Sequence, residues 1–106
     1  MQFNCQETDE TVLYKLLTGT IIPRPIGWIS TIDENGINNL APFSYFNMVS
    51  SKPPCVMFST RRDNNKNKDT LNNVLQNEEF VVNLVTHDVV EQMNTTSASV
   101  ELTVDE

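Results

Sequence analysis

The sequence predicts a mainly β protein with short helices in its connections, in the form of a small Greek-key or split β-barrel. Four apolar segments have the length and residue types of strands and are bounded by turn residues. The segments between them are short, which favours antiparallel pairing of the strands. With 106 residues, the chain is expected to form one domain with a modest core. Four or five strands do not close a barrel, so we expect a second copy or further chain to cover the open edges.

The first predicted element is a helix over residues 8–17, which begins at a cap formed by Thr8 or Asp9 and ends near Gly19. Its apolar stripe is expected to pack as core or as a lid over the barrel, and consists of Val12, Leu13, Leu16 and Leu17. An extended connector with two prolines follows, because proline disfavours helix in the residue before it.

A β-hairpin is predicted next, because residues 26–32 alternate as a strand does and are followed by the turn signal Asp33–Gly36. Its second strand is expected to span residues 37–46, and a loop is expected over 48–52. A third strand at 55–60 is nearly all apolar, and we therefore expect it at the centre of the sheet.

The second half of the chain is predicted to begin with a polar surface loop over 61–67 and a helix that opens at Lys68–Thr70. The buried side of this helix is expected to carry Leu71, Val74 and Leu75. Residues 79–85 are predicted as a fourth strand and residues 86–93 as a short third helix. The alternation in the tail predicts a last strand that contains Val100, Leu102 and Val104.

The charge of the chain is acidic overall and basic in one place. Seven basic and fourteen acidic residues give a net charge of −7, which argues against nucleic acid as the main partner. Five basic residues and one acidic residue lie between Lys52 and Lys68. This concentration predicts a site for one small anion, the alternative being an ordinary solvated loop.

Several classes of protein and site are not expected from this sequence. No apolar run has membrane-spanning length, and the N-terminus lacks the pattern of a secretory signal, so we expect a cytoplasmic protein without a membrane partner. Cys5, Cys55 and His87 form neither a zinc motif nor a disulfide framework, so no metal site is expected. Motifs of hydrolases and of glycine-rich nucleotide loops are absent, so any difficult chemistry is expected to come from a cofactor.

The nonapeptide Asn39–Asn47 is the first candidate for ligand binding. Its aromatic residues are typical of a strand, but Pro42 donates no ladder hydrogen bond and belongs at a sheet edge or a bulge. Small polar side chains and large flat ones surround this proline. The mixture suits a ligand with a polar tail and an aromatic head, and the alternative is an irregular edge strand that binds nothing.

The start of the second predicted helix is the other candidate. The first turn of a helix has unpaired N–H groups that favour a phosphate, to which Lys68 would add a charge and Thr70 a hydroxyl donor. Asp69 is a poor phosphate ligand, and we expect it to cap the helix or to brace Lys68. Ser59 and Arg61 would supply further donors. The alternative is a capped helix beside a basic loop.

Six stretches together resemble the flavin reductase-like family, in particular the flavoredoxin-type branch of the FMN-binding split barrels. The resemblance extends from about residue 13 to residue 93. It is carried by Tyr14–Leu17, Ile22–Thr31, Asn39–Ser44, Ser51–Pro54, Lys68–Thr70 with Asn73, and Glu79–Asn83. Arg24 and Trp28 match the N-terminal signature of the family, and we expect them to pack or to lie at an interface, the alternative being a direct contact with the flavin.

The resemblance implies a six-stranded split barrel that forms a homodimer and binds FMN noncovalently near the dimer interface. It also implies an oxidoreductase that transfers a hydride from NADH or NADPH to the bound flavin and on to flavin or another acceptor. Chains of this family are usually longer, so residues 1–106 are expected to be the N-terminal half to two-thirds of the usual flavin reductase-like domain. The alternatives are a non-catalytic flavin-binding or assembly module and a flavoredoxin-like electron carrier.

Carried over by position, the implied site residues form three groups. Two residues at the end of the first strand would lie along the flavin, namely Ser30 and Thr31. The ring and the ribityl chain would be wrapped by Ala41, Pro42, Phe43, Ser44, Tyr45, Phe46 and Asn47. The phosphate would be held, with Asp69 nearby, by Ser59, Arg61, Lys68 and Thr70. No residue is expected to be catalytic, because hydride transfer needs positioning more than an acid or a base.

Overall fold

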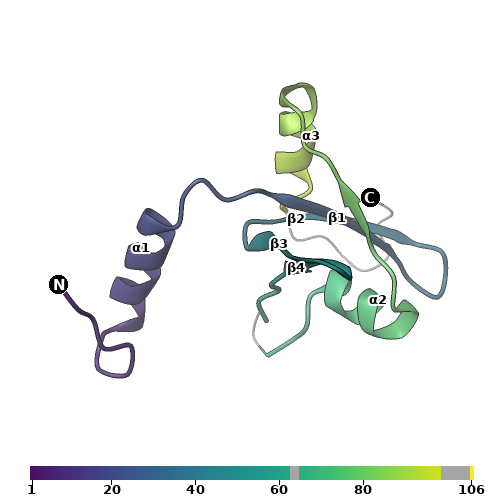
Figure 1. Cartoon of the computed structure of the whole chain (residues 1–106). Coiled ribbons are helices and arrows are strands. Elements are labelled where there is room, and N and C mark those ends of the chain that lie inside the picture. Colours follow the sequence, from purple (N-terminus) through teal and green to yellow (C-terminus); the bar gives the residue numbers. More distant parts are fainter. Residues whose placement is uncertain (63–64, 99–105) are drawn as a thin grey trace.

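The computed structural model describes residues 1–62, 65–98 and 106 (Figure 1). Five strands and short helices follow one another in these ranges. In chain order they are α1 (Glu10–Thr20), β1 (Gly27–Ile32), β2 (Asn38–Phe43), β3 (Phe46–Ser51), β4 (Pro54–Phe58), α2 (Asp69–Asn77), β5 (Val81–Asn83), the 3-10 turn η1 (His87–Val89) and α3 (Val90–Thr95). The strand predicted around Val100, Leu102 and Val104 lies outside the described residues.

The predicted hairpin is confirmed. β1 and β2 pair antiparallel, with Gly27 opposite Phe43 and Ile32 opposite Asn38. The turn forms because the Asp33 carboxylate accepts hydrogen bonds from the N–H groups of Asn35 and Ile37, each at 2.8 Å. β5 pairs with the other side of β1, so the three-stranded sheet has the order β2-β1-β5. Among the described strands, the one that contains Pro42 thus lies at the edge of its sheet, where a proline is tolerated.

Two predictions about the neighbouring strands are wrong. The segment expected as one strand over 37–46 bends at Ser44 and Tyr45, and β3 begins after the bend and includes most of the expected loop over 48–52. β4, expected at the centre of a sheet, pairs among the described strands with β3 in a separate two-stranded sheet. Its residue Met57 is 49% exposed. The polar residues of β3 are tolerated because this small sheet faces solvent, which also explains the exposure of β4.

The core of the described chain is small. Ile29 is fully buried, and Phe43 and Met93 are nearly so. The ring of Phe58 lies 5.0 Å from the ring of Phe43 and 5.0 Å from the ring of Phe80, so one aromatic cluster joins the end of β2, the end of β4 and the start of β5.

α2 packs on β1 and β2 through polar side chains, and of the three residues expected on its buried side Leu71 and Val74 are half-buried and Leu75 is exposed. Thr70 and Asn73 are 1% and 8% exposed, whereas Leu75 is 67% exposed. The Asn73 amide donates to the Thr31 hydroxyl at 3.0 Å, and one turn later the Asn77 amide donates to the Ile32 carbonyl. Hydrogen bonds with the hairpin select this face over the leucines, because buried amides need partners.

The start of α2 also differs from the expectation. Lys68 takes the cap position with extended backbone, and Asp69 is the first residue inside the helix rather than the cap. Partial burial raises the pKa of the Asp69 carboxyl above its ordinary value of 3.8. The helix ends at Glu78, which has the left-handed backbone conformation with φ 57°.

α1 begins as predicted and packs differently from the prediction. The Asp9 carboxylate accepts hydrogen bonds from the N–H groups of Thr11 and Val12, so Asp9 is the cap. The helix stands apart from the sheets in Figure 1, and within the described ranges it buries none of its residues. The expectation that its apolar stripe is core is therefore wrong for the described chain. None of the described helices has the length and apolarity needed to span a membrane.

The chain is less compact than its length predicts. Its radius of gyration is 15.8 Å, against about 13 Å for a compact chain of this length. It exposes 8478 Å², whereas a compact protein of this mass exposes about 6,000 Å². The chain therefore leaves more of its surface exposed than a compact protein of the same mass does.

Gly27→Ala is expected to destabilise the fold by about 1–3 kcal/mol, because it overpacks the contact between the sheets. A Cβ atom at Gly27 would lie 2.6 Å from the ring of Phe46 and 3.1 Å from its Cβ atom. Gly19→Ala is the matched control, since a Cβ atom there meets nothing within 4 Å, and it should be neutral or stabilising by about 0.5 kcal/mol. Urea denaturation measures both values, and equal stability of the two variants contradicts the packing of Phe46 on Gly27.

The raised pKa of Asp69 predicts a pH dependence of stability. Between pH 3.8 and the folded pKa, the folded chain holds a proton that the unfolded chain has lost. The stabilisation is therefore fully present below the unfolded pKa and is lost as the pH rises through the folded pKa. Asp69→Asn should remove this dependence, so the variant gains stability relative to the wild type as the pH rises through this window. Denaturation over a pH series checks the sign, and an unchanged difference contradicts it.

Candidate functional site

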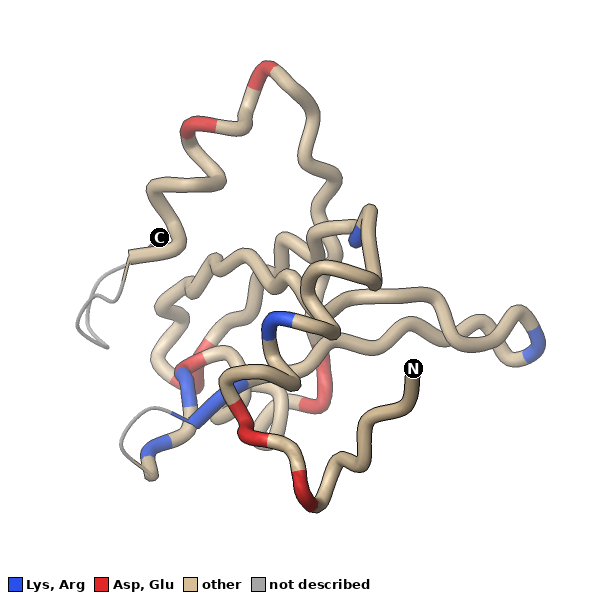
Figure 2. The backbone as a smooth tube through the Cα atoms, turned by 90° about the vertical axis from the view of Figure 1, so that its left-hand side faces the viewer, with Lys and Arg blue, Asp and Glu red and all other residues tan. Residues whose placement is uncertain are grey.

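A small cavity of about 280 Å³ brings together three cationic side chains and two serines. Its lining consists of Tyr14, Thr18, Arg24, Pro42, Phe43, Ser44, Tyr45, Ser59, Arg61 and Lys68. None of these described residues is acidic, although the chain as a whole is. Figure 2 shows basic residues gathered on one side of the molecule, in the loop between β4 and α2 that supplies Arg61 and leads to Lys68. We call this space the cationic cavity.

The fold brings the walls of the cationic cavity from four places in the chain. Ser44 and Tyr45 form the bend between β2 and β3. The N–H group of Ser59, just beyond the end of β4, donates to the Tyr45 carbonyl at 2.9 Å. This hydrogen bond holds the end of β4 against the bend and so places the two serines at one cavity. Lys68 reaches the same cavity from the start of α2.

Arg24 forms the wall that faces α1. Its Nη1 atom donates to the carbonyls of Thr18 and Ile21, at 2.8 and 2.6 Å. These are the carbonyls of the last helical turn, where a cation is favourable. The Nε atom of Arg24 is buried and has no hydrogen-bond partner in the described part of the chain. A donor in this state typically costs about 1–3 kcal/mol, so an acceptor is missing at this position.

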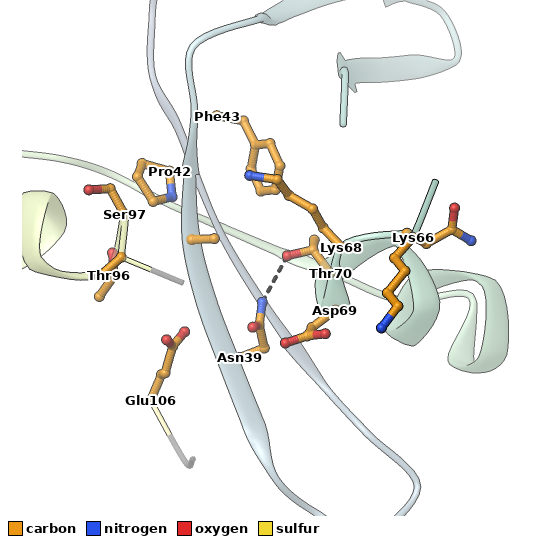
Figure 3. Close-up of a pocket in the computed structure, with 13 residues that line it drawn as sticks. Asn39, Pro42, Phe43, Lys66, Lys68, Asp69, Thr70, Thr96, Ser97 and Glu106 are labelled. Carbon is orange, nitrogen blue, oxygen red and sulfur yellow. Dashed lines mark hydrogen bonds between the residues drawn. The ribbon is translucent and has the colours of Figure 1, made fainter. Parts of the chain in front are cut away.

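A larger cavity of about 570 Å³ adjoins the cationic cavity along β2 (Figure 3). The two share Pro42, Phe43 and Lys68. In Figure 3 the Lys68 side chain extends from the start of α2 toward the ring of Phe43. The rest of the lining of this β2 cavity consists of Asn39, Ala41, Lys66, Asn67, Asp69, Thr70, Thr96, Ser97, Ala98 and Glu106.

The polar groups of the β2 cavity are held by hydrogen bonds. The Asn39 amide donates to the Thr70 hydroxyl at 2.8 Å. The Glu106 carboxylate accepts from the N–H group of Leu40 at 2.8 Å, and its own N–H group donates to the Asn38 carbonyl. Two carboxylates, those of Asp69 and Glu106, thus lie on the β2 cavity, whereas the cationic cavity has none in its described lining. An anionic group is therefore favoured in the smaller cavity and a neutral one in the larger.

A third cavity of about 550 Å³ lies between α1 and the bend, and its lining is mostly apolar. It shares Tyr14, Thr18 and Arg24 with the cationic cavity. Phe46 and Asn47, predicted to lie along the ligand, line this apolar cavity rather than the other two.

The structure brings most of the sequence-predicted site residues together. Seven of them line the cationic cavity: Pro42, Phe43, Ser44, Tyr45, Ser59, Arg61 and Lys68. Ala41, Asp69 and Thr70 line the β2 cavity. Ser30 and Thr31 line none of the three cavities as described, because the Ser30 hydroxyl accepts from Asn83 and the buried Thr31 hydroxyl from Asn73. Thr70, expected at the phosphate, bonds Asn39 instead.

Several lining residues are absent from the sequence prediction. Tyr14 and Thr18 come from α1, whose apolar stripe was expected to be core or a lid, and they are four residues apart, so they share one face of the helix. Arg24 was expected to pack or to lie at an interface, and its place between two prolines gave no sign of the cavity. Asn39 stood among the polar residues of the nonapeptide, and its contact with Thr70 is visible only in the folded chain.

Comparison with known proteins identifies the family to which the chain belongs. The family model described as "Flavin reductase like domain" matches residues 18–106. An uncharacterised protein of Aquifex aeolicus is 54% identical over 94 residues, which are 88% of this chain and 48% of that protein. The chain spans about half the length of the curated relatives it matches.

Solved structures with a similar fold support the predicted fold class. The crystal structure of nitrilotriacetate monooxygenase component B from Bacillus cereus is similar, with a TM-score of 0.87 and 38% identity over 98% of this chain and 52% of that one. A Shewanella frigidimarina protein with a split barrel domain has a TM-score of 0.74 at 22% identity, over 100% of this chain and 52% of that one, which supports the fold alone. The predicted mainly β split-barrel class is confirmed, and the chain belongs to the flavin reductase-like domain family.

Proposed function

We propose that this chain forms the FMN-binding part of a flavin reductase-like oxidoreductase. In this proposal a hydride passes from NAD(P)H to noncovalently bound flavin and on to flavin or another acceptor. The observation that carries the proposal is the pair of adjoining cavities, one cationic and small, the other larger and bordered by β2. FMN has a matching division, because a phosphate ends a chain that starts at a flat, uncharged ring.

The donor set of the cationic cavity suits a phosphate monoester. Arg61 offers a planar fork of N–H donors and Lys68 a compact charge, and the hydroxyls of Ser44 and Ser59 complete the set. Charge-assisted hydrogen bonds of this kind are roughly twice as strong as neutral ones. The absence of carboxylates from the described lining means that a dianion meets no like charge there.

The β2 cavity suits the ring and the ribityl chain. Phe43 offers a flat apolar surface, and Ala41 leaves room beside it. The amide of Asn39 has a second N–H and a carbonyl in addition to its bond with Thr70, and these match the donors and acceptors of a flavin ring. The route from the ring to the phosphate would follow Pro42, Phe43 and Lys68, the residues that both cavities share.

The residues of this site bind and orient rather than transfer protons. Bound flavin would supply the hydride-accepting ring, so the protein contributes position and exclusion of water. Phe43 and the shared wall at Pro42 would fix the plane of the ring, and the cations would fix the phosphate. The absence of an assigned catalytic residue follows from this division of labour.

A homodimer is part of the proposal. The chain exposes about 2,500 Å² more than a compact protein of its mass, which is in the range that obligate interfaces bury. Apolar residues of α1 and of the β3–β4 sheet contribute to this surface, among them Leu17, Met48 and Met57. A second copy would cover such a surface and bring further polypeptide near the flavin.

The basic test is the flavin content and mass of the purified protein. We expect a peak in size-exclusion chromatography with the mass of a dimer and, after addition of FMN, the absorbance of stoichiometric flavin. The same sample should oxidise NADH or NADPH when FMN is in excess. Flavin binding without oxidation indicates a binding module or an electron carrier, and a protein that binds no FMN contradicts the proposal.

The phosphate assignment is tested by comparing FMN with riboflavin, which has no phosphate. Arg61→Ala combined with Lys68→Ala should weaken FMN by about a hundredfold, since two charge-assisted hydrogen bonds are worth about 3 kcal/mol or more. The affinity of the same double variant for riboflavin should fall less than about threefold. Arg62→Ala is the matched control, because Arg62 is exposed and lines none of the three cavities. Equal weakening of both flavins by the double variant contradicts the assignment.

A further inference from the structure

We infer that Arg24 is a third cation of the phosphate site and that it couples phosphate binding to the position of α1. The inference rests on the proposed function, since it names a further binding residue of the same site. It goes beyond that proposal because it links the ligand to a helix that lies outside the sheets.

The first support is the place of Arg24. It lines the cationic cavity together with Arg61 and Lys68, and its buried Nε atom has no hydrogen-bond partner in the described part of the chain. A guanidinium has five N–H donors in a planar fork, of which Nη1 is engaged by the carbonyls of α1. Arg24 is only partly buried and borders the cavity, so a phosphate oxygen there would accept from an N–H group of the guanidinium other than the enclosed Nε–H.

The second support is the way in which α1 is held. The helix buries none of its residues in the described chain, so few contacts fix its direction. Two of them are the hydrogen bonds from Arg24 to Thr18 and Ile21. Tyr14 and Thr18 line the cationic cavity on the side of the helix. A ligand that fixes the Arg24 guanidinium therefore also fixes the last turn of α1.

Linkage makes the coupling reciprocal. If phosphate binding holds α1 in place, then an α1 already in place binds phosphate more tightly. A purely structural Arg24, which only satisfies the helix carbonyls, has a different consequence. It would affect FMN and riboflavin equally, because the helix does not distinguish between them.

The experiment measures two quantities on Arg24→Ala, Arg24→Lys and a control. The first is the ratio of the dissociation constants for FMN and riboflavin. The second is hydrogen exchange of the amides in the last turn of α1, with and without ligand. Lys15→Ala is the matched control, because Lys15 is an exposed cation on the same helix that lines none of the three cavities.

We expect Arg24→Ala to raise the dissociation constant for FMN at least tenfold and that for riboflavin less than threefold. Arg24→Lys should retain part of the wild-type preference for FMN over riboflavin. FMN should slow exchange in the last turn of α1 in the wild type and in Lys15→Ala, riboflavin should not, and Arg24→Ala should lose the effect. Arg61→Ala, saturated with FMN, should keep the slowed exchange because its Arg24 is intact.

Two results overturn the inference while the proposed function stands. One is an FMN-to-riboflavin ratio that Arg24→Ala leaves unchanged, and the other is exchange in α1 that responds equally to both flavins. If the wild type binds neither flavin, the proposed function fails. Inorganic phosphate then tests Arg24 alone. If phosphate slows exchange in α1 of the wild type and Arg24→Ala abolishes this effect, the result supports a phosphate site at Arg24. If phosphate leaves the exchange of the wild type unchanged, the result contradicts such a site.

Discussion

The structure depends on the buried hydrogen bonds between α2 and the β1–β2 hairpin. Asn73 bonds Thr31 and Thr70 bonds Asn39, so a helix with an exposed leucine is held by its polar face. Breaking either pair would leave a buried polar group without a partner. Because these bonds fix the first turn of α2, they also set the position of Lys68 between the two cavities. The fold and the site thus share the same few polar contacts.

Local chemistry made much of the fold predictable. Asp33 and Gly36 indicated the hairpin, and Asp9 indicated the start of α1, because each acts through its immediate neighbours in the chain. The prediction failed where the structure of a segment depends on contacts with residues far away in the sequence. β3 exists because β4 pairs with it, and the buried face of α2 is polar because Thr31 lies opposite Asn73. Neither feature can be inferred from the sequence of β3 or of α2 alone.

The residues of the candidate site also divide into those that local sequence predicts and those that depend on distant contacts. Ser59, Arg61 and Lys68 were predictable because they lie in or beside one basic segment of an acidic sequence, and Ser44 is one of the small polar residues near Pro42. Their meeting depends on the hydrogen bond from Ser59 to Tyr45, which joins segments that no sequence pattern relates. For Arg24 the sequence offered a contact with the flavin only as an alternative to packing, since its observed partners are carbonyls and any residue has a carbonyl.

The close contact of Gly27 with Phe46 has a consequence for ligand recognition. Gly27 stands opposite Phe43 in the sheet and lies against the ring of Phe46, so one glycine borders both ends of the bend that carries Ser44 and Tyr45. The bend is held before any ligand arrives. In the proposed site, the backbone of the bend would therefore need little ordering when a ligand binds, and preorganisation of this kind improves affinity without any new contact.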